Sequence, residues 1–123
     1  MVPGTHLTVM DGPQTEAEKH KLKNVPYMNM IGALRYAADA TRPDICFTVS
    51  YLARFLSNPG SKHVEAVHHC FQYLKGTADY WLELGGKQEL TLSGFCDTDG
   101  STSEGSKAIS GSIFKLGNST INW

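Results

Sequence analysis

Hydrophobic positions recur with a helical period through residues 24–76 and with a period of two after Gly76. In the first stretch the apolar residues return at steps of three and four, the spacing that gathers side chains on one face of an α-helix. In the second stretch apolar and polar residues alternate, as they do in a strand with one buried face. The pattern predicts an α+β chain in which three helices precede an antiparallel sheet, with a domain boundary at Gly76.

Residues 1–23 are polar and contain two prolines and two glycines. They are predicted to form an extended lead-in that packs poorly, with a short helical turn over residues 16–21. The first helix is predicted to begin near Asn24, a residue type that caps helix N-termini, with Pro26 in the first turn, where its missing N–H costs nothing. It should end near Ala40. Its apolar stripe consists of Tyr27, Ile31, Leu34 and Ala38.

A second helix is predicted to start at the run TRPD. Thr41 can cap this helix, and Asp44 would complete a capping box in which aspartate replaces the usual glutamate. Pro43 is tolerated because it falls in the first turn. The sequence Asn-Pro-Gly at residues 58–60 should end the helix.

The third helix is predicted to begin with Ser61 as its cap and to end at Gly76. Four possible metal ligands lie on it, namely His63, His68, His69 and Cys70. No two of these histidines are four residues apart, and the HExxH motif is absent. The residues are therefore interpreted as exposed histidines beside a buried cysteine.

Beyond Gly76 the alternating pattern predicts a strand at residues 81–84, then a second strand at residues 90–97, after a Gly-Gly turn. A polar loop follows to residue 107, and residues 109–116 form the next predicted strand. Gly117 and Asn118 make a tight hairpin turn, and residues 119–123 begin a further strand. Because that strand has no room to finish, the C-terminus is expected to be cut.

Asp97 and Asp99 follow a predicted strand and, two residues apart, would point to the same face. Carboxylate oxygens are the ligands that Mg²⁺ prefers, and a site that cleaves phosphodiesters commonly holds two such ions. Two metal ions, however, need more than two carboxylates. The alternative interpretation is a solvated turn, in which aspartate is favoured because it hydrogen-bonds the nearby backbone.

The composition adds few constraints on partners. The formal net charge is −1, so no overall electropositivity points to nucleic acid. Arg42 and Lys75 are candidates for phosphate contacts, with a solvated surface as the alternative. Three widely spaced cysteines and the absence of a signal peptide or a long apolar run favour an intracellular protein, cytoplasmic or nuclear, that is not secreted and has no membrane partner.

Four runs occur in order with short gaps: VPYMNMIGALRY, TRPDICFTVSYLARFLSNP, HCFQYLKGT and SGFCDTD. Together they resemble the Pol polyprotein of Ty1/copia-type retrotransposons. TRPDI with a downstream YLKGT is far more specific than a lone motif, and the resemblance covers nearly the whole chain. ISGSIFKLGNSTINW is similar to the second strand, hairpin and third strand of the family's RNase H domain.

The resemblance implies a lead-in (1–23), a helical connection region of a reverse transcriptase (24–76) and the N-terminal strands of a truncated RNase H-like α/β domain (77–123). By this resemblance Asp97 matches the first metal-binding aspartate of RNase H, and Asp99 matches the second Asp of the family's Asp-Ala-Asp run. The parent protein would synthesise DNA on RNA and hydrolyse RNA in RNA–DNA hybrids with Mg²⁺. Its partners would be the hybrid and the rest of the polyprotein.

The chain departs from the family pattern around its chemistry. The polymerase motif Tyr-x-Asp-Asp and the later RNase H carboxylates are absent, and Gly100 stands where the family usually has Trp. One or two carboxylates cannot hold two metal ions, so the fragment itself is expected to be inactive and to bind no cofactor. Two alternatives stay open: a non-catalytic module that binds nucleic acid or protein, and a pseudogene product without a selected function.

Overall fold

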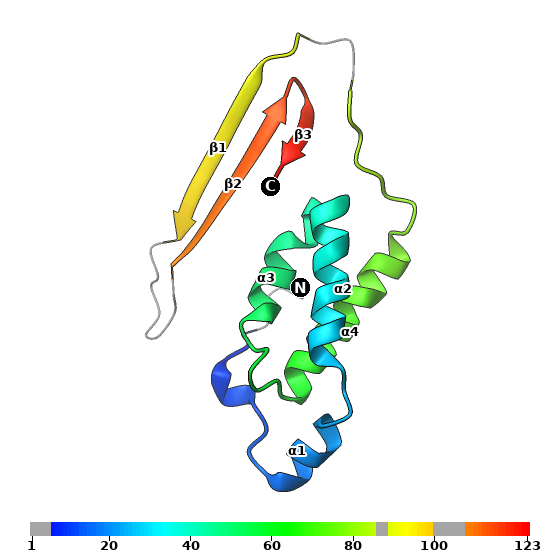
Figure 1. The fold of residues 1–123 in the computed structure, drawn as a ribbon, viewed down its shortest axis with the longest axis vertical. Helices are drawn as coiled ribbons and strands as arrows, with labels where there is room; N and C mark the ends of the chain where they lie inside the picture. The colour runs from blue at the N-terminus through cyan, green and yellow to red at the C-terminus, as the bar shows by residue number, and fades with distance from the viewer. Residues whose placement is uncertain (1–5, 86–88, 100–107) are drawn as a thin grey trace. The chain divides into compact units, whose positions relative to one another are not determined.

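A computed structural model describes residues 6–85, 89–99 and 108–123, with the side chain of Asp99 left undescribed. The chain divides into two compact units, a helical unit (Met1–Trp81) and a sheet unit (Leu82–Trp123). The predicted mixed α+β class is confirmed: four α-helices precede a three-stranded antiparallel sheet in the described residues (Figure 1). The division falls between Trp81 and Leu82, shortly after the change of period at Gly76.

The helical unit contains α1 (Glu16–Leu22), α2 (Tyr27–Ala40), α3 (Cys46–Ala53) and α4 (Ser61–Gly76). Two short 3₁₀ helices, η1 (Val9–Asp11) and η2 (Pro43–Ile45), precede α1 and α3. The predicted turn in the lead-in is α1, where Thr15 accepts a hydrogen bond from the Glu18 amide at 3.2 Å. The glutamate accepts one in return from the Thr15 amide, so a capping box starts this helix.

Several predicted helix ends are wrong by a few residues. Pro26, not Asn24, caps α2, which ends at Ala40 as predicted. Thr41 closes α2 instead of opening the next helix, because its amide donates to the Ala37 carbonyl. The capping box predicted with Asp44 is absent, since this carboxylate binds Arg42.

The ends of α3 and α4 differ in the same way. Helix α3 ends at Ala53, and the next four residues form turns before the Asn-Pro-Gly run that was predicted to stop it. Gly60, not Ser61, caps α4, and Gly76 is its last helical residue. The reason for Gly60 is a tertiary contact: its place beside the Asp11 backbone leaves no room for a side chain.

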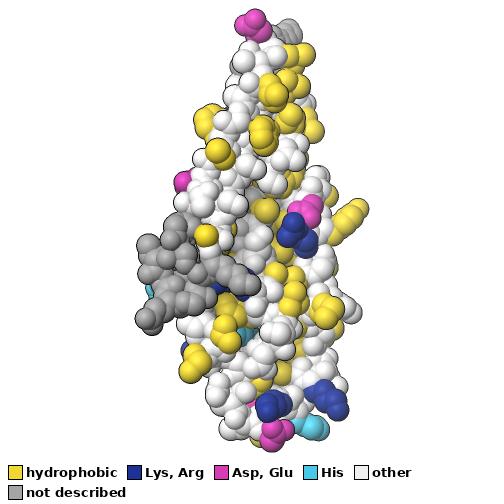
Figure 2. All heavy atoms as spheres, turned by 60° about the vertical axis from the view of Figure 1, so that its left-hand side comes forward, with side chains coloured by type: hydrophobic (Ala, Val, Ile, Leu, Met, Phe, Trp, Pro, Cys, Tyr) yellow, Lys and Arg dark blue, Asp and Glu magenta, His cyan; other side chains and the backbone are white. Residues whose placement is uncertain are grey.

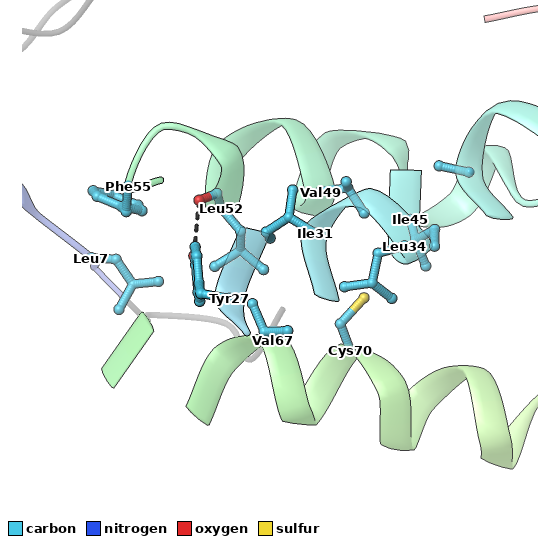
Figure 3. Packing of buried hydrophobic residues seen from close by; sticks show 11 residues of the cluster. Leu7, Tyr27, Ile31, Leu34, Ile45, Val49, Leu52, Phe55, Val67 and Cys70 are labelled. Carbon is cyan, nitrogen blue, oxygen red and sulfur yellow. Dashed lines mark hydrogen bonds between the residues drawn. The ribbon is translucent and has the colours of Figure 1, made fainter. Parts of the chain in front are cut away.

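The core of the helical unit lies between α2, α3 and α4, and Figure 3 shows Val67 and Cys70 of α4 pointing into it. The predicted stripe of α2 is buried in full. Its first member, Tyr27, donates its hydroxyl proton to the Leu52 carbonyl at 2.9 Å (Figure 3), so the one polar atom of that ring is satisfied. Burial raises the pKa of this hydroxyl to about 12.

The lead-in packs against the helices, contrary to the prediction. The Leu7 side chain is 5% exposed and belongs to the core, and η1 contacts α4. The Tyr51 hydroxyl donates to the Leu7 carbonyl at 2.8 Å. Among residues 6–23, only Leu7 carries a buried apolar side chain, and such a single position leaves no periodic signal in the sequence.

Alanine at two glycines should change stability in opposite directions. A Cβ on Gly60 would collide with the Asp11 carbonyl oxygen, although the backbone angles there suit any residue (φ −95°, ψ 177°). A Cβ on Gly76 would meet no atom within 4 Å. We expect Gly60→Ala to lower the free energy of unfolding by about 1–3 kcal/mol. Gly76→Ala should raise it by about 0.5–1 kcal/mol, because alanine restricts the unfolded chain.

Urea unfolding followed by far-UV circular dichroism checks both values. Equal destabilisation by the two substitutions would contradict the contact between Gly60 and Asp11, since a Cβ on Gly76, at the other end of the same helix, meets no atom within 4 Å.

The sheet unit is built from β1 (Leu92–Asp99), β2 (Ile109–Leu116) and β3 (Ser119–Asn122), in the order β1-β2-β3. Strands β1 and β2 pair with Leu92 opposite Leu116 and Asp97 opposite Gly111. The predicted hairpin turn is confirmed: Gly117 has φ 60°, the left-handed conformation that such a turn requires.

The strand predicted at residues 81–84 is wrong, because these residues are not in the sheet. The segment ends at Gly85, whose amide donates to the Ser119 hydroxyl at 2.8 Å. That hydroxyl donates in turn to the Gly85 carbonyl at 3.2 Å. The Ser119 side chain therefore satisfies both the amide and the carbonyl of Gly85 by hydrogen bonds.

The sheet exposes much apolar surface. Figure 2 shows hydrophobic side chains, drawn in yellow, along the surface of the sheet unit. Alternation places Phe95 and Ile113 opposite each other on one face, and Phe114 and Leu92 on the other. Phe95 is 63% exposed and Leu92 64%. Among the described residues of the sheet unit, none belongs to a buried hydrophobic core comparable with that of the helices.

Candidate functional site

Asp97 and Asp99 lie in the last residues of β1, where the sequence placed them. Asp97 faces Gly111 across the strand pair and Asp99 faces Ile109, so the two residues occupy one face of the sheet. The Asp97 side chain is exposed, and one of its oxygens accepts the Thr98 amide at 2.8 Å. This contact is the local backbone hydrogen bond of an aspartate that faces solvent.

The metal donors near Asp97 are few. Across the residues that the structure describes, no group of three or more His, Cys, Asp or Glu side chains could hold a metal ion. A pair of Mg²⁺ ions needs several carboxylates around it. The described residues alone do not supply such a set of carboxylates.

Arg42 is buried, with 10% of its side chain exposed, and it binds Asp44 through two parallel hydrogen bonds. The Nε–Oδ1 distance is 3.0 Å and the Nη2–Oδ2 distance is 2.8 Å. This fork geometry is the strong form of an arginine–carboxylate pair. The guanidinium lowers the pKa of the Asp44 carboxyl, and the carboxylate raises the pKa of Arg42.

The same guanidinium also holds the C-terminal end of α4. Its Nη1 donates to the Thr77 carbonyl at 3.1 Å and its Nη2 to the Thr77 hydroxyl at 2.7 Å. The Tyr73 hydroxyl donates to Asp44 at 2.9 Å, and this bond raises the pKa of Tyr73. Arg42 also lies 5.5 Å from the Tyr73 ring centroid and 5.7 Å from that of Tyr80.

These contacts join the two most specific sequence runs, and we call the four residues Arg42, Asp44, Tyr73 and Thr77 the motif lock. Arg42 and Asp44 belong to TRPD, and the other two residues belong to YLKGT. The structure therefore gives both motifs a structural use, since they fix η2 to the end of α4. The sequence analysis identified both runs but did not predict that Tyr73 and Thr77 bind Arg42 and Asp44. The available signal was the presence of TRPDI together with a downstream YLKGT.

The two candidate phosphate contacts occupy different surroundings. Four guanidinium hydrogen bonds of Arg42 go to Asp44 and Thr77, so this cation is committed inside the protein. Lys75 is exposed in the last turn of α4, where a cation also favours the helix dipole. Arg42 and Lys75 therefore do not form one basic patch.

The prediction of exposed histidines is wrong for His63, which is fully buried, and holds for His68 and His69. The Gly60 amide donates to His63 Nδ1 at 2.8 Å, and Nε2 lies 3.1 Å from the Thr8 carbonyl oxygen. The imidazole stacks on Phe55 with 4.1 Å between ring centroids. Burial lowers the pKa of His63, so the neutral ring is favoured. Cys70 beside it on α4 is buried, as predicted, and burial raises the pKa of its thiol.

Among the described residues, no helix is both long and apolar enough to span a bilayer. No family model matches the chain, and no solved structure is significantly similar to it.

Several relatives share most of the chain. It is 38% identical, over 90% of its length, to the retrovirus-related Pol polyprotein from transposon TNT 1-94 of Nicotiana tabacum, of which it spans 8%. It is 35% identical, over 83% of its length, to secreted RxLR effector protein 161 of Plasmopara viticola, of which it spans 72%.

The third relative is the retrovirus-related Pol polyprotein from transposon RE1 of Arabidopsis thaliana, 32% identical over 79% of this chain and 7% of that protein. The matches to the two polyproteins, over 90% and 79% of this chain, are too long to leave out the two runs joined by the motif lock. The chain therefore belongs to the Pol polyprotein family of copia-type retrotransposons.

Proposed function

We propose that this chain is the connecting segment between the reverse transcriptase and the RNase H of a copia-type Pol polyprotein, and that its helical unit serves as a scaffold. The observation that supports this most directly is the motif lock. It engages both charged residues of the TRPD run in contacts inside the helical unit. Residues used in this way hold a fold in place.

The sheet unit in this proposal is the N-terminal part of an RNase H-like domain. Its three antiparallel strands and the position of Asp97 at the end of β1 support that assignment. In the parent protein, Asp97 would bind Mg²⁺ with carboxylates that this chain does not carry. The RNA–DNA hybrid and the remaining polyprotein are the proposed partners of that parent, which would also synthesise DNA on an RNA template.

The chain by itself should not hydrolyse RNA in an RNA–DNA hybrid. Asp97 and Asp99 alone supply fewer carboxylates than two metal ions on a phosphodiester need. The measurement is cleavage of a labelled hybrid by the purified 123-residue chain with Mg²⁺ or Mn²⁺. The expected result is no turnover above that of buffer.

The matched control is Asp97→Asn, which keeps the size of the side chain and removes its charge. Turnover by the unaltered chain that Asp97→Asn abolishes would sink the proposal. Binding of uncleaved hybrid that weakens steeply with salt would favour the alternative, a non-catalytic module that contacts phosphates. If the chain neither cleaves nor binds the hybrid at low salt, the result supports the scaffold.

A further inference from the structure

Residues 7–12 are held on the helical unit by contacts from several elements, and we call this segment the N-terminal clasp. Leu7 inserts its side chain into the core, and its carbonyl accepts the Tyr51 hydroxyl of α3 at 2.8 Å. At the other end of the clasp, Asp11 pairs with Lys62 of α4 at 2.6 Å. Gly60 gives the Asp11 carbonyl room to approach, because it has no side chain.

His63 lies at the centre of these contacts, and its ring contacts the Gly60 amide and the Thr8 carbonyl. A backbone amide can only donate, so the bond from Gly60 requires a lone pair on Nδ1. A carbonyl oxygen can only accept, so the contact with Thr8 requires the proton on Nε2. These two partners together select the neutral ring with its proton on Nε2.

We propose that His63 is a proton-operated latch for the N-terminal clasp: the neutral ring holds residues 7–12 on the helical unit, and protonation releases them. A second proton would sit on Nδ1 and face the Gly60 N–H, so one buried hydrogen bond would become a contact between two donors. It would also place a charge in a fully buried site against the Phe55 ring. Opening the clasp relieves both costs, because the exposed ring can then turn its Nδ1–H away from the Gly60 N–H and toward water.

The charged groups around His63 act in opposite directions. The Thr8 carbonyl and Asp11 of η1 favour the imidazolium, and Lys62 of α4 disfavours it. The neighbour from the turns that follow α3 is the uncharged Phe55 ring. Burial is the largest influence, and it lowers the pKa of His63 below its ordinary value of 6.5. The clasp therefore has its full stability above that value and loses it as the pH falls further, while the open form takes up the proton.

Protonation of Asp11 cannot loosen the N-terminal clasp in the same pH range. Its hydrogen bonds to Lys62 and Thr8 lower the pKa of its carboxyl to about 2. The carboxylate therefore stays ionised, and the ion pair with Lys62 persists, until the solution is far more acidic. A change in mildly acidic solution can thus be assigned to the histidine.

The test is nuclear magnetic resonance of the full chain between about pH 7.5 and pH 5, a range that brackets ordinary histidine titration. Three signals are followed: the His63 imidazole, the Leu7 methyl groups and the exchange rate of the Gly60 amide. We expect the Leu7 methyls to shift toward their unfolded values with the same midpoint as the imidazole. Protection of the Gly60 amide, corrected for intrinsic exchange, should fall by up to about tenfold per pH unit.

His63→Gln should remove the pH dependence, whereas His68→Gln and His69→Gln should keep it, because those histidines are exposed on the same helix. If His63→Gln does not fold, the midpoints of the unaltered chain decide by themselves. Leu7 methyls that stay in place while His63 titrates would overturn the proposal. So would a His63→Gln chain that keeps the original pH dependence, or loss of α2 amide protection together with Leu7, which would mean global unfolding.

Discussion

Replacing Arg42 by alanine should lower the free energy of unfolding of the helical unit by about 3 kcal/mol. The substitution leaves the Asp44 carboxylate half-buried without its cation, and it removes both bonds to Thr77. The value is placed at the low end for broken buried pairs because 34% of the Asp44 side chain reaches solvent. Urea unfolding followed by circular dichroism measures the loss.

The chain offers a control in Arg35, whose Nε donates to both carboxylate oxygens of Asp39 at 2.8 and 3.0 Å. Both side chains of this pair are more than half exposed, so Arg35→Ala should cost less than about 1 kcal/mol. Arg42→Lys separates charge from shape, since lysine keeps the charge and loses the fork. If the motif lock is correct, Arg42→Lys should restore little of the free energy of unfolding that Arg42→Ala loses. Equal costs at Arg42 and Arg35 would contradict it.

Leu34→Ala should be equally or more damaging, lowering the free energy of unfolding by about 2–5 kcal/mol. Leu34 is fully buried in α2 and faces the cluster that α3 and α4 complete (Figure 3). Truncation removes apolar contacts and leaves a cavity that a three-helix core can close only in part. A loss of this size approaches the whole stability of a small domain, so the helical signal should fall even without denaturant.

Tyr36 on the same helix supplies the control because its side chain is 79% exposed. Tyr36→Ala should change the stability by no more than about 0.5 kcal/mol, and alanine even favours the helix. A similar loss at both positions would show that α2 is not oriented as described. The comparison tests which face of α2 is buried, since Leu34 and Tyr36 are two residues apart but lie on opposite sides of the helix, one buried and one exposed.

Much of the fold follows from signals that act within a few residues of the chain. Periodicity placed α2 and its buried stripe, and alternation placed β1 and β2. Gly117 and Asn118 specified the hairpin, because a left-handed residue was needed between two alternating runs. The strand expected at residues 81–84 shows the limit of this reasoning, since alternation indicates that a segment could pair but not whether a partner is available.

The candidate site divides in the same way. The position of Asp97 at a strand end could be read from the sequence, and the family of the chain could be read from four runs of residues. The surroundings of Arg42 and His63 could not. Arg42 was expected to contact phosphates, yet it is buried against Thr77, which is 35 positions away in the chain. His63 was expected to face water, yet it is buried against Thr8, which is 55 positions away.

By itself, the sequence determined most helices and strands of the described residues, their order and the Pol polyprotein family to which the chain belongs. Only the tertiary structure decided that the TRPD and YLKGT runs lock together, that the lead-in is held against the helices, and that His63 must be neutral. The physical reason is range. Helical period, alternation and turn chemistry are properties of neighbouring residues, whereas the burial of a charge or a ring depends on which distant backbone groups meet it.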